Sequence, residues 1–233
     1  MLGSIGAYAQ TVTVTGSIEI VRHDSQPKNS TNAGVVVWLT PVADEGSTSV
    51  SRPLVPAKHR AVLLQKNKMF EPHLLVIPVG SEVDFPNKDP FFHNVFSLFE
   101  GKRFDLGLYE SGTTKSIRFD RVGVSFLFCN IHSEMSAVVV TLDTPYFSIA
   151  DRAGQVSIPD VPPGSYTLHA WREGALPATL KSLARFIHVS EDSPSFGKLA
   201  IPDNPALPLT HKNKYGQDYI NPTPPGNVYY QRP

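Results

Sequence analysis

Short runs of β-branched and aromatic residues, separated by proline, glycine, asparagine and aspartate, recur throughout this chain. No convincing window places apolar residues at i, i+3, i+4 and i+7, the pattern of an amphipathic helix. Many short strands separated by turn residues are typical of β-sandwiches. Only 99–110 and 175–184 are expected to hold a helical turn. We therefore expect an all-β fold with strands at 11–21, 34–41, 61–66, 73–78, 81–86, 93–98, 115–120, 122–128, 136–142, 155–158, 165–171 and 184–189.

The composition limits the class of protein and its partners. With 233 residues, of which 41% are hydrophobic and 18% charged, the chain can bury one or two globular cores. Lys+Arg and Asp+Glu both number 21, so no excess charge attracts nucleic acid or an anionic membrane. No apolar run approaches the roughly 18 residues of a membrane span. We therefore expect no nucleic-acid partner and no transmembrane segment.

Three segments differ from the strand-rich body. Residues 1–9 end in the small-x-small step Ala7-Tyr8-Ala9, which fits a signal-peptidase site, although the stretch before it is short and lacks basic residues. We interpret 1–9 as a signal-peptide remnant, with an ordinary chain end as the alternative, and expect a periplasmic or secreted protein. Residues 43–58 have the composition of a linker. The proline-rich tail, 202–233, is expected to be disordered or draped as an extended arm over the body.

The single cysteine, Cys129, lies in VGVSFLFCNIHSEMSAVVVTL at 122–142, so no internal disulfide is possible. A lone cysteine is either an inert buried residue or a chemically active one. Here a strand-like run leads into Cys129, His132 and Met135, and a second strand-like run follows. Thiolate, imidazole and thioether on one tight loop favour copper, and a Cys, two His and a weak axial Met form a blue-copper electron-transfer centre.

The second histidine must come from elsewhere, because three residues of one short loop cannot surround an ion. His93, in FPNKDPFFHNVFS at 85–97, follows a Pro/Asn/Asp turn and opens a predicted strand. A zinc site is the nearest alternative, but structural zinc usually has four Cys or His ligands and does not use Met. A Cys/His nucleophile pair fits less well, since such residues are normally far apart in sequence and have an orienting partner.

Two stretches, MFEPHLLVIPVGSEVDFPNKDPFFHNVFS and VSFLFCNIHSEM, resemble the two halves of a plastocyanin-like, or cupredoxin, domain over roughly 59–143. The resemblance implies a Greek-key β-sandwich that binds one mononuclear type 1 copper ion. His93, Cys129 and His132 would be the equatorial ligands and Met135 the axial ligand. The short Cys-x2-His-x2-Met loop is similar to that of amicyanin.

Several residues near these ligands carry further expectations. Asn94 matches the family asparagine after the first histidine, and the resemblance implies a hydrogen bond to Asn130 that ties the two ligand segments together. Glu134 either lowers the reduction potential by stabilising Cu(II) or faces solvent. His73 either approaches the copper site or packs at one end of the sandwich. For His211, in the tail, the sequence indicates no partner.

A second resemblance is carried by PYFSIADRAGQVSIPDVPPGSYTLHAWRE at 145–173. Its turn residues, which include Asp151, Gly154 and Tyr166, resemble the carboxypeptidase regulatory-like (transthyretin-like) β-sandwich, and 14–42 fits the first strands of that family. We expect 10–45 plus 145–195 to form one split sandwich into which the cupredoxin domain, 59–143, is inserted. No peptidase activity is expected, because no zinc motif such as H-E-x-x-H is present.

The combination of these two domains resembles the arrangement in methylamine-utilization-type plastocyanin-like proteins. They imply a non-enzymatic copper protein that exchanges single electrons with a c-type cytochrome or a dehydrogenase. The alternative is a copper-binding, chaperone or protein-docking module without an electron-transfer role. An oxidase-type enzyme is disfavoured, because multicopper enzymes need additional His-x-His clusters and this sequence has none.

Overall fold

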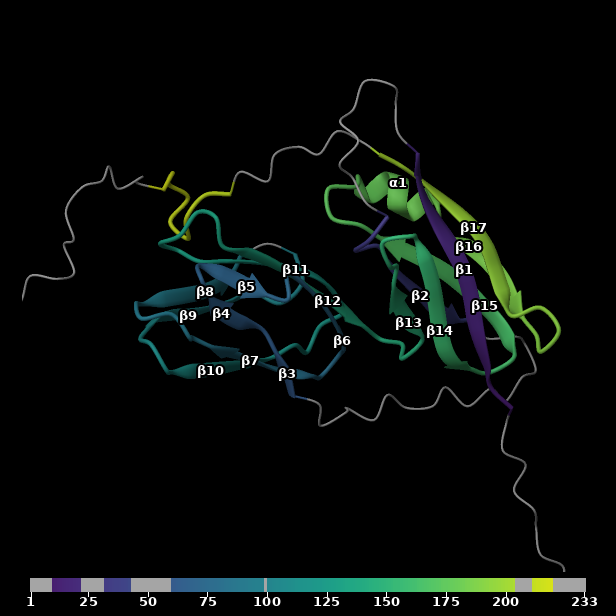
Figure 1. Ribbon diagram of the computed structural model, residues 1–233, viewed down its shortest axis with the longest axis horizontal. Coiled ribbons are helices and arrows are strands. Elements are labelled where there is room, and N and C mark those ends of the chain that lie inside the picture. Colours follow the sequence, from purple (N-terminus) through teal and green to yellow (C-terminus); the bar gives the residue numbers. More distant parts are fainter. Residues whose placement is uncertain (1–9, 22–31, 43–59, 99, 204–210, 220–233) are drawn as a thin grey trace, which may run out of the picture.

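The computed structural model describes residues 10–21, 32–42, 60–98, 100–203 and 211–219, and within these ranges the expected all-β fold is confirmed. The expected remnant, 1–9, and linker, 43–58, lie outside the described residues. The strands form two bodies that lie side by side (Figure 1). We call the body built from 60–142 the central sandwich, and the body built from the segments on either side of it the flanking sandwich.

The central sandwich consists of a five-stranded sheet, a three-stranded sheet and a small hairpin. The five-stranded sheet has the order β6 (Leu74–Pro78), β12 (Ser136–Leu142), β11 (Gly123–Phe128), β8 (His93–Ser97) and β9 (Phe104–Tyr109). The facing sheet has the order β10 (Thr114–Arg118), β7 (Glu82–Pro86) and β3 (Arg60–Val62), and the hairpin pairs β4 (Leu64–Lys66) with β5 (Met69–Glu71).

The flanking sandwich takes strands from before and after the central one. Its outer sheet has the order β14 (Gln155–Val161), β1 (Val12–Val21) and β17 (Ser195–Pro202). Its inner sheet has the order β13 (Phe147–Ile149), β2 (Val36–Pro41), β15 (Gly164–Trp171) and β16 (Arg185–Val189). Because β1 pairs with β14 and β17, and β2 with β13 and β15, each sheet joins segments separated by the whole central sandwich.

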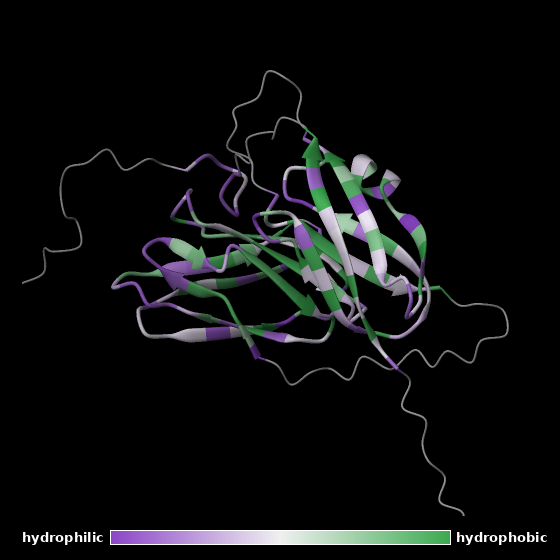
Figure 2. Cartoon of the chain, turned by 45° about the vertical axis from the view of Figure 1, so that its right-hand side comes forward, coloured by the Kyte–Doolittle hydropathy of each residue, from purple (hydrophilic) through white to green (hydrophobic). Residues whose placement is uncertain are grey.

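Three apolar clusters hold the four sheets together as a stack. One fills the flanking sandwich, a second fills the central sandwich, and the third lies between β2 of the first body and β12 of the second. The buried core of this third cluster, the middle cluster, is formed by Val36, Val138, Val140 and Leu142. The strands that meet there are apolar on both faces, which accounts for the continuous runs GVVVWL and SAVVVTL (Figure 2).

The motif residues of the second resemblance form turns or, as with Tyr166 on β15, hydrogen-bond to one. Asp151 Oδ1 accepts hydrogen bonds from the N–H groups of Ala153 and Gln155 at 2.9 and 2.8 Å. Gly154 has φ 83°, and a Cβ atom there would lie 2.3 Å from the carbonyl oxygen of Ile18, so glycine is required. The Tyr166 hydroxyl donates to the Pro162 carbonyl at 2.8 Å. These residues shape the flanking sandwich, in keeping with a structural role.

Some local predictions differ from the structure. The helical turn expected within 99–110 is wrong, because 104–109 is strand β9. Gly107, with φ 65°, interrupts the alternation that would identify this strand. Strand β17 was also not predicted, and its last residue, Pro202, lies at the start of the expected tail. The helical turn expected within 175–184 is confirmed as α1 (Pro177–Ser182). Among the described residues, no helix is long and apolar enough to cross a membrane.

His73 connects the two sandwiches. Its Nε2 atom lies 2.7 Å from Oε2 of Glu173, which follows β15, and its Nδ1 atom lies 3.0 Å from the carbonyl oxygen of Ser136. Both partners are acceptors, so the protonated imidazolium satisfies both contacts. The hydrogen bond that the His73 ring donates to Glu173 raises the pKa of His73 above 6.5, although burial acts in the opposite direction.

This pair predicts a pH dependence of stability. A raised folded-state pKa stabilises the fold below the unfolded value of 6.5, and that contribution is lost as the pH rises through the raised value. The effect should stay below about 1 kcal/mol, because the pair is partly exposed. When the pH is raised from about 5.5 to 8.5, we expect the free energy of unfolding, measured with urea, to decrease by a smaller amount in His73→Gln than in the wild type. Identical pH dependence in the two proteins would exclude this role.

Candidate metal centre

The candidate ligands come from two segments that the sheet brings together. His93 opens β8, and Cys129 directly follows β11. These strands are antiparallel neighbours paired at Phe96 and Phe128, so the start of β8 lies beside the end of β11. The 129–135 loop is closed by backbone hydrogen bonds, from Cys129 N–H to the Met135 carbonyl and from Met135 N–H to the His132 carbonyl, both 3.2 Å. Buried β-strands therefore fix both ligand segments.

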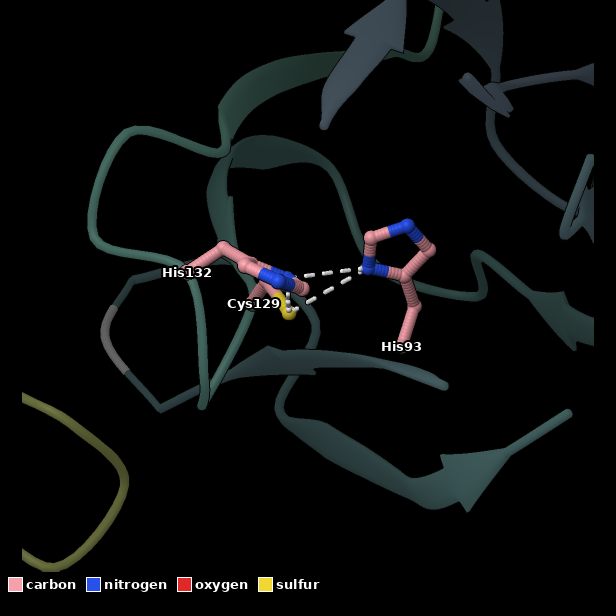
Figure 3. A group of neighbouring side chains, drawn as sticks. All are labelled: His93, Cys129 and His132. Carbon is pink, nitrogen blue, oxygen red and sulfur yellow. Dashed lines mark hydrogen bonds between the residues drawn. The ribbon is translucent and has the colours of Figure 1, made fainter. Parts of the chain in front are cut away.

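His93, Cys129 and His132 point toward one another (Figure 3). The Nδ1 atoms of the two histidines are 3.1 Å apart. Cys129 Sγ lies 3.8 Å from Nδ1 of His93 and 3.6 Å from Nδ1 of His132. His93 and Cys129 are buried and His132 is half-buried. The three donor atoms form a compact triangle that is partly exposed to solvent only at His132.

This triangle fits a single metal ion. Bonds of about 2.0 Å to imidazole nitrogen and about 2.3 Å to thiolate sulfur place donors in a trigonal plane about 3.5–3.7 Å apart. The observed separations of 3.1, 3.6 and 3.8 Å lie around these values. In the metal-free chain, burial raises the pKa of the Cys129 thiol and lowers that of His132. Metal binding at this site would therefore displace a thiol proton.

Met135 completes the loop on its buried side. Its side chain is fully buried in the same apolar cluster as Cys129. A weak axial thioether ligand would come from this position, as the loop spacing indicates. Its role as fourth donor remains a prediction.

Asp89 is the residue near the ligands that sequence reasoning missed. Its carboxylate Oδ2 lies 2.8 Å from His93 Nε2, and both groups are buried. The N–H groups of Asn67 and Lys68, in the turn between β4 and β5, donate to the same carboxylate at 2.6 and 2.9 Å. Burial alone would raise the pKa of Asp89, but the hydrogen bonds from Lys68, His93 and Asn67 hold it below its ordinary value. The ionised carboxylate keeps a proton on Nε2 and leaves Nδ1 free to ligate.

We expect Asp89→Asn to weaken metal binding at this site by about 10- to 100-fold, because partners of this kind orient a ligating histidine and raise its basicity. Competition with a chelator of known affinity measures the effect. Asp120→Asn, which alters an exposed carboxylate paired with Lys102, is the matched control and should leave the affinity unchanged. Equal affinities in the two variants would contradict the role of Asp89.

The other expected neighbours are arranged differently. The bond from Asn94 to Asn130 is not formed: Asn94 Nδ2 donates to Asp105 Oδ1 at 2.7 Å, and no described residue hydrogen-bonds to Asn94 Oδ1. Asn130 Oδ1 instead accepts from the N–H group of Lys214 in the tail. Glu134 is exposed. The ring of His73 reaches the ligand loop only as far as the carbonyl of Ser136, the residue after Met135, and it lies outside the His–Cys–His triangle. Asn94 pairs with Asp105 and not with Asn130 because the charged Asp105 carboxylate on β9 is the stronger acceptor.

Comparisons with known proteins agree with the all-β fold. A family model described as polysaccharide lyase family 4, domain II, matches residues 131–193, which is less than half of the chain. No curated protein matches. The carboxypeptidase regulatory-like resemblance therefore remains a prediction from turn motifs, without support from these comparisons.

Solved structures similar to this chain include an amicyanin, a purple cupredoxin and a copper-containing nitrite reductase. A reduced mutant of amicyanin is 21% identical, covers 36% of this chain and 82% of its own, and has a TM-score of 0.34. A purple cupredoxin from Nitrosopumilus maritimus is 24% identical; the match covers 35% of this chain and 99% of the cupredoxin, with a TM-score of 0.32. A copper-containing nitrite reductase from Thermus scotoductus SA-01 is 22% identical; the match covers 45% of this chain and 26% of the reductase, with a TM-score of 0.35.

Proposed function

We propose that this chain is a type 1 copper protein that transfers single electrons. The observation that carries the proposal is the triangle of two imidazole Nδ1 atoms and the Cys129 sulfur, in which His93 and Cys129 are buried and His132 is half-buried. Zinc is a poorer fit, since the triangle offers three Cys or His donors among the described residues, and the loop ends at a buried methionine, Met135. Soft sulfur donors with imidazole favour copper.

When bound, copper would supply reversible exchange of one electron between Cu(I) and Cu(II). The chain contributes a site that changes little between these states. Strands β8 and β11 hold His93 and Cys129, and Asp89 fixes the ring of His93 through Nε2. The apolar cluster around Cys129 and Met135 excludes water. A rigid, dry donor set of this kind keeps the reorganisation that accompanies electron transfer small.

The half-buried His132 is the candidate port for electrons. Next to it, Ile131 is 42% exposed, and the ring of Phe91 lies 5.6 Å from the His132 ring, with the neighbouring Phe92 51% exposed. Exposed apolar side chains around a metal edge suit a transient contact with another redox protein. We propose a c-type cytochrome or a dehydrogenase as that partner, no enzymatic activity of the chain itself, and a periplasmic or extracellular location.

Copper loading of the purified protein tests this function. We expect Cu(II) to produce an intense thiolate-to-copper absorption near ~600 nm and the centre to cycle reversibly in voltammetry. A colourless protein that binds only Cu(I) and cannot be oxidised reversibly would contradict electron transfer and favour a copper chaperone. Failure to bind copper would exclude both functions.

A further inference from the structure

Residues 211–219 form a compact segment, the C-terminal strap, that lies against the candidate ligand loop. The strap folds on itself through hydrogen bonds from Asn213 N–H to the Gln217 carbonyl and from Gly216 N–H to the Asn213 carbonyl, both 2.9 Å. Figure 1 shows it in yellow, next to the loops at one end of the central sandwich. It is separated from Cys129 by more than eighty residues of sequence, yet it contacts the segment that begins there.

The strap hydrogen-bonds to two backbone carbonyls of the ligand loop, those of Cys129 and Ser133. The Tyr219 hydroxyl donates to the Cys129 carbonyl at 2.7 Å. His211 Nε2 lies 2.9 Å from the Ser133 carbonyl oxygen, and its ring stacks on Phe128 with centroids 3.9 Å apart. The Tyr219 hydroxyl also lies 3.1 Å from His211 Nδ1. Tyr219 and His211 therefore contact each other, and each also contacts a backbone carbonyl of the ligand loop.

Lys214 links the same loop to the other ligand segment. Its N–H group donates to Asn130 Oδ1 at 3.0 Å, and its ammonium group donates to Asp105 Oδ2 at 2.8 Å. The second oxygen of Asp105 accepts from Asn94 Nδ2, directly after His93. A continuous path therefore runs from Asn130 through Lys214 and Asp105 to Asn94. It replaces the direct bond between Asn94 and Asn130 that the family resemblance implied.

We propose that Tyr219 and Lys214 are positioning residues of the metal centre: the strap fixes the ligand loop against the His93 segment. This inference rests on the proposed function. The loop needs such support because Ile131, Ser133 and Glu134 are exposed and pack against little of the core. Hydrogen bonds to charged groups, such as the one between Lys214 and Asp105, are the stronger class and hold a fixed geometry. Partners that orient a ligand in this way contribute to metal affinity.

Two conservative variants, each with a matched control, test the proposal in the 233-residue chain. Tyr219→Phe removes only the hydroxyl that contacts Cys129, and its control is Tyr166→Phe, which removes a hydroxyl that also donates to a backbone carbonyl, that of Pro162 in the flanking sandwich. Lys214→Met removes only the ammonium group, and its control is Lys212→Met, at an exposed side chain paired within the strap to Asp218. The readouts are Cu(I) affinity by chelator competition, the reduction potential and the position of the thiolate-to-copper band.

We expect about tenfold weaker copper binding in Tyr219→Phe and in Lys214→Met, with a shifted potential, and less than twofold change in both controls. A simple loss of stability would leave the band and potential of the loaded protein unchanged. The proposal is overturned if either strap variant matches its own control in affinity and potential. A wild-type protein without the ~600 nm band would instead refute the proposed function, so the two failures are distinguishable.

Discussion

Replacing Cys129 with serine is expected to abolish the absorption of the Cu(II) protein near ~600 nm and to weaken copper binding by at least about 100-fold. The band arises from charge transfer between a thiolate and copper, and Cys129 is the only cysteine in the chain. A serine hydroxyl is a harder donor that does not ionise near neutral pH, so it replaces neither the charge nor the softness of the thiolate.

The loss of copper should also be visible in stability. A ligand that binds only the native state stabilises it by RT ln(1 + [L]/Kd), about 4 kcal/mol at a thousandfold excess over Kd. Copper should therefore raise the unfolding midpoint of the wild type and have little effect on Cys129→Ser.

Met135→Leu is the companion variant for the absorption band: it changes the predicted axial donor, keeps the side-chain volume and should retain the band. Retention of the band in Cys129→Ser would refute the assignment of the thiolate.

The second large effect is expected in the middle cluster. Val36, the first residue of β2, is fully buried in the layer between β2 and β12 that joins the flanking and central sandwiches. Val36→Asp would place a carboxylate among valine and leucine side chains. Burial of an unpaired charge costs several kcal/mol, so we expect the free energy of unfolding to fall by about 3–5 kcal/mol.

Urea unfolding followed by fluorescence measures this loss. Val122→Asp is the matched control, because the same substitution falls on a side chain that is 52% exposed, before β11. We expect it to change stability by less than about 0.5 kcal/mol. If the two variants unfold at similar urea concentrations, the middle cluster does not contribute to stability and the two sandwiches are not held together through it.

The candidate site illustrates which contacts a sequence reveals. Cys129, His132 and Met135 are close together in the chain, so one short loop between two predicted strands already places them near one another. His93 was identified because it opens a strand after a turn, and the pairing of β8 with β11 brings it to that loop. Asp89 could have been suspected from its position four residues before His93 in the same turn, but no local pattern shows that both groups are buried.

The sequence by itself determined the all-β class, most strand positions and the donor chemistry, because alternation, turn residues and ligand spacing are local properties of the chain. Only the tertiary structure decided how Asn94 is paired, since the competing Asp105 carboxylate lies on a strand whose pattern was obscured by Gly107. It alone placed Lys214 and Tyr219 on the ligand loop. These contacts join residues more than eighty positions apart, and the hydrogen bonds that form there depend on which groups packing brings within reach.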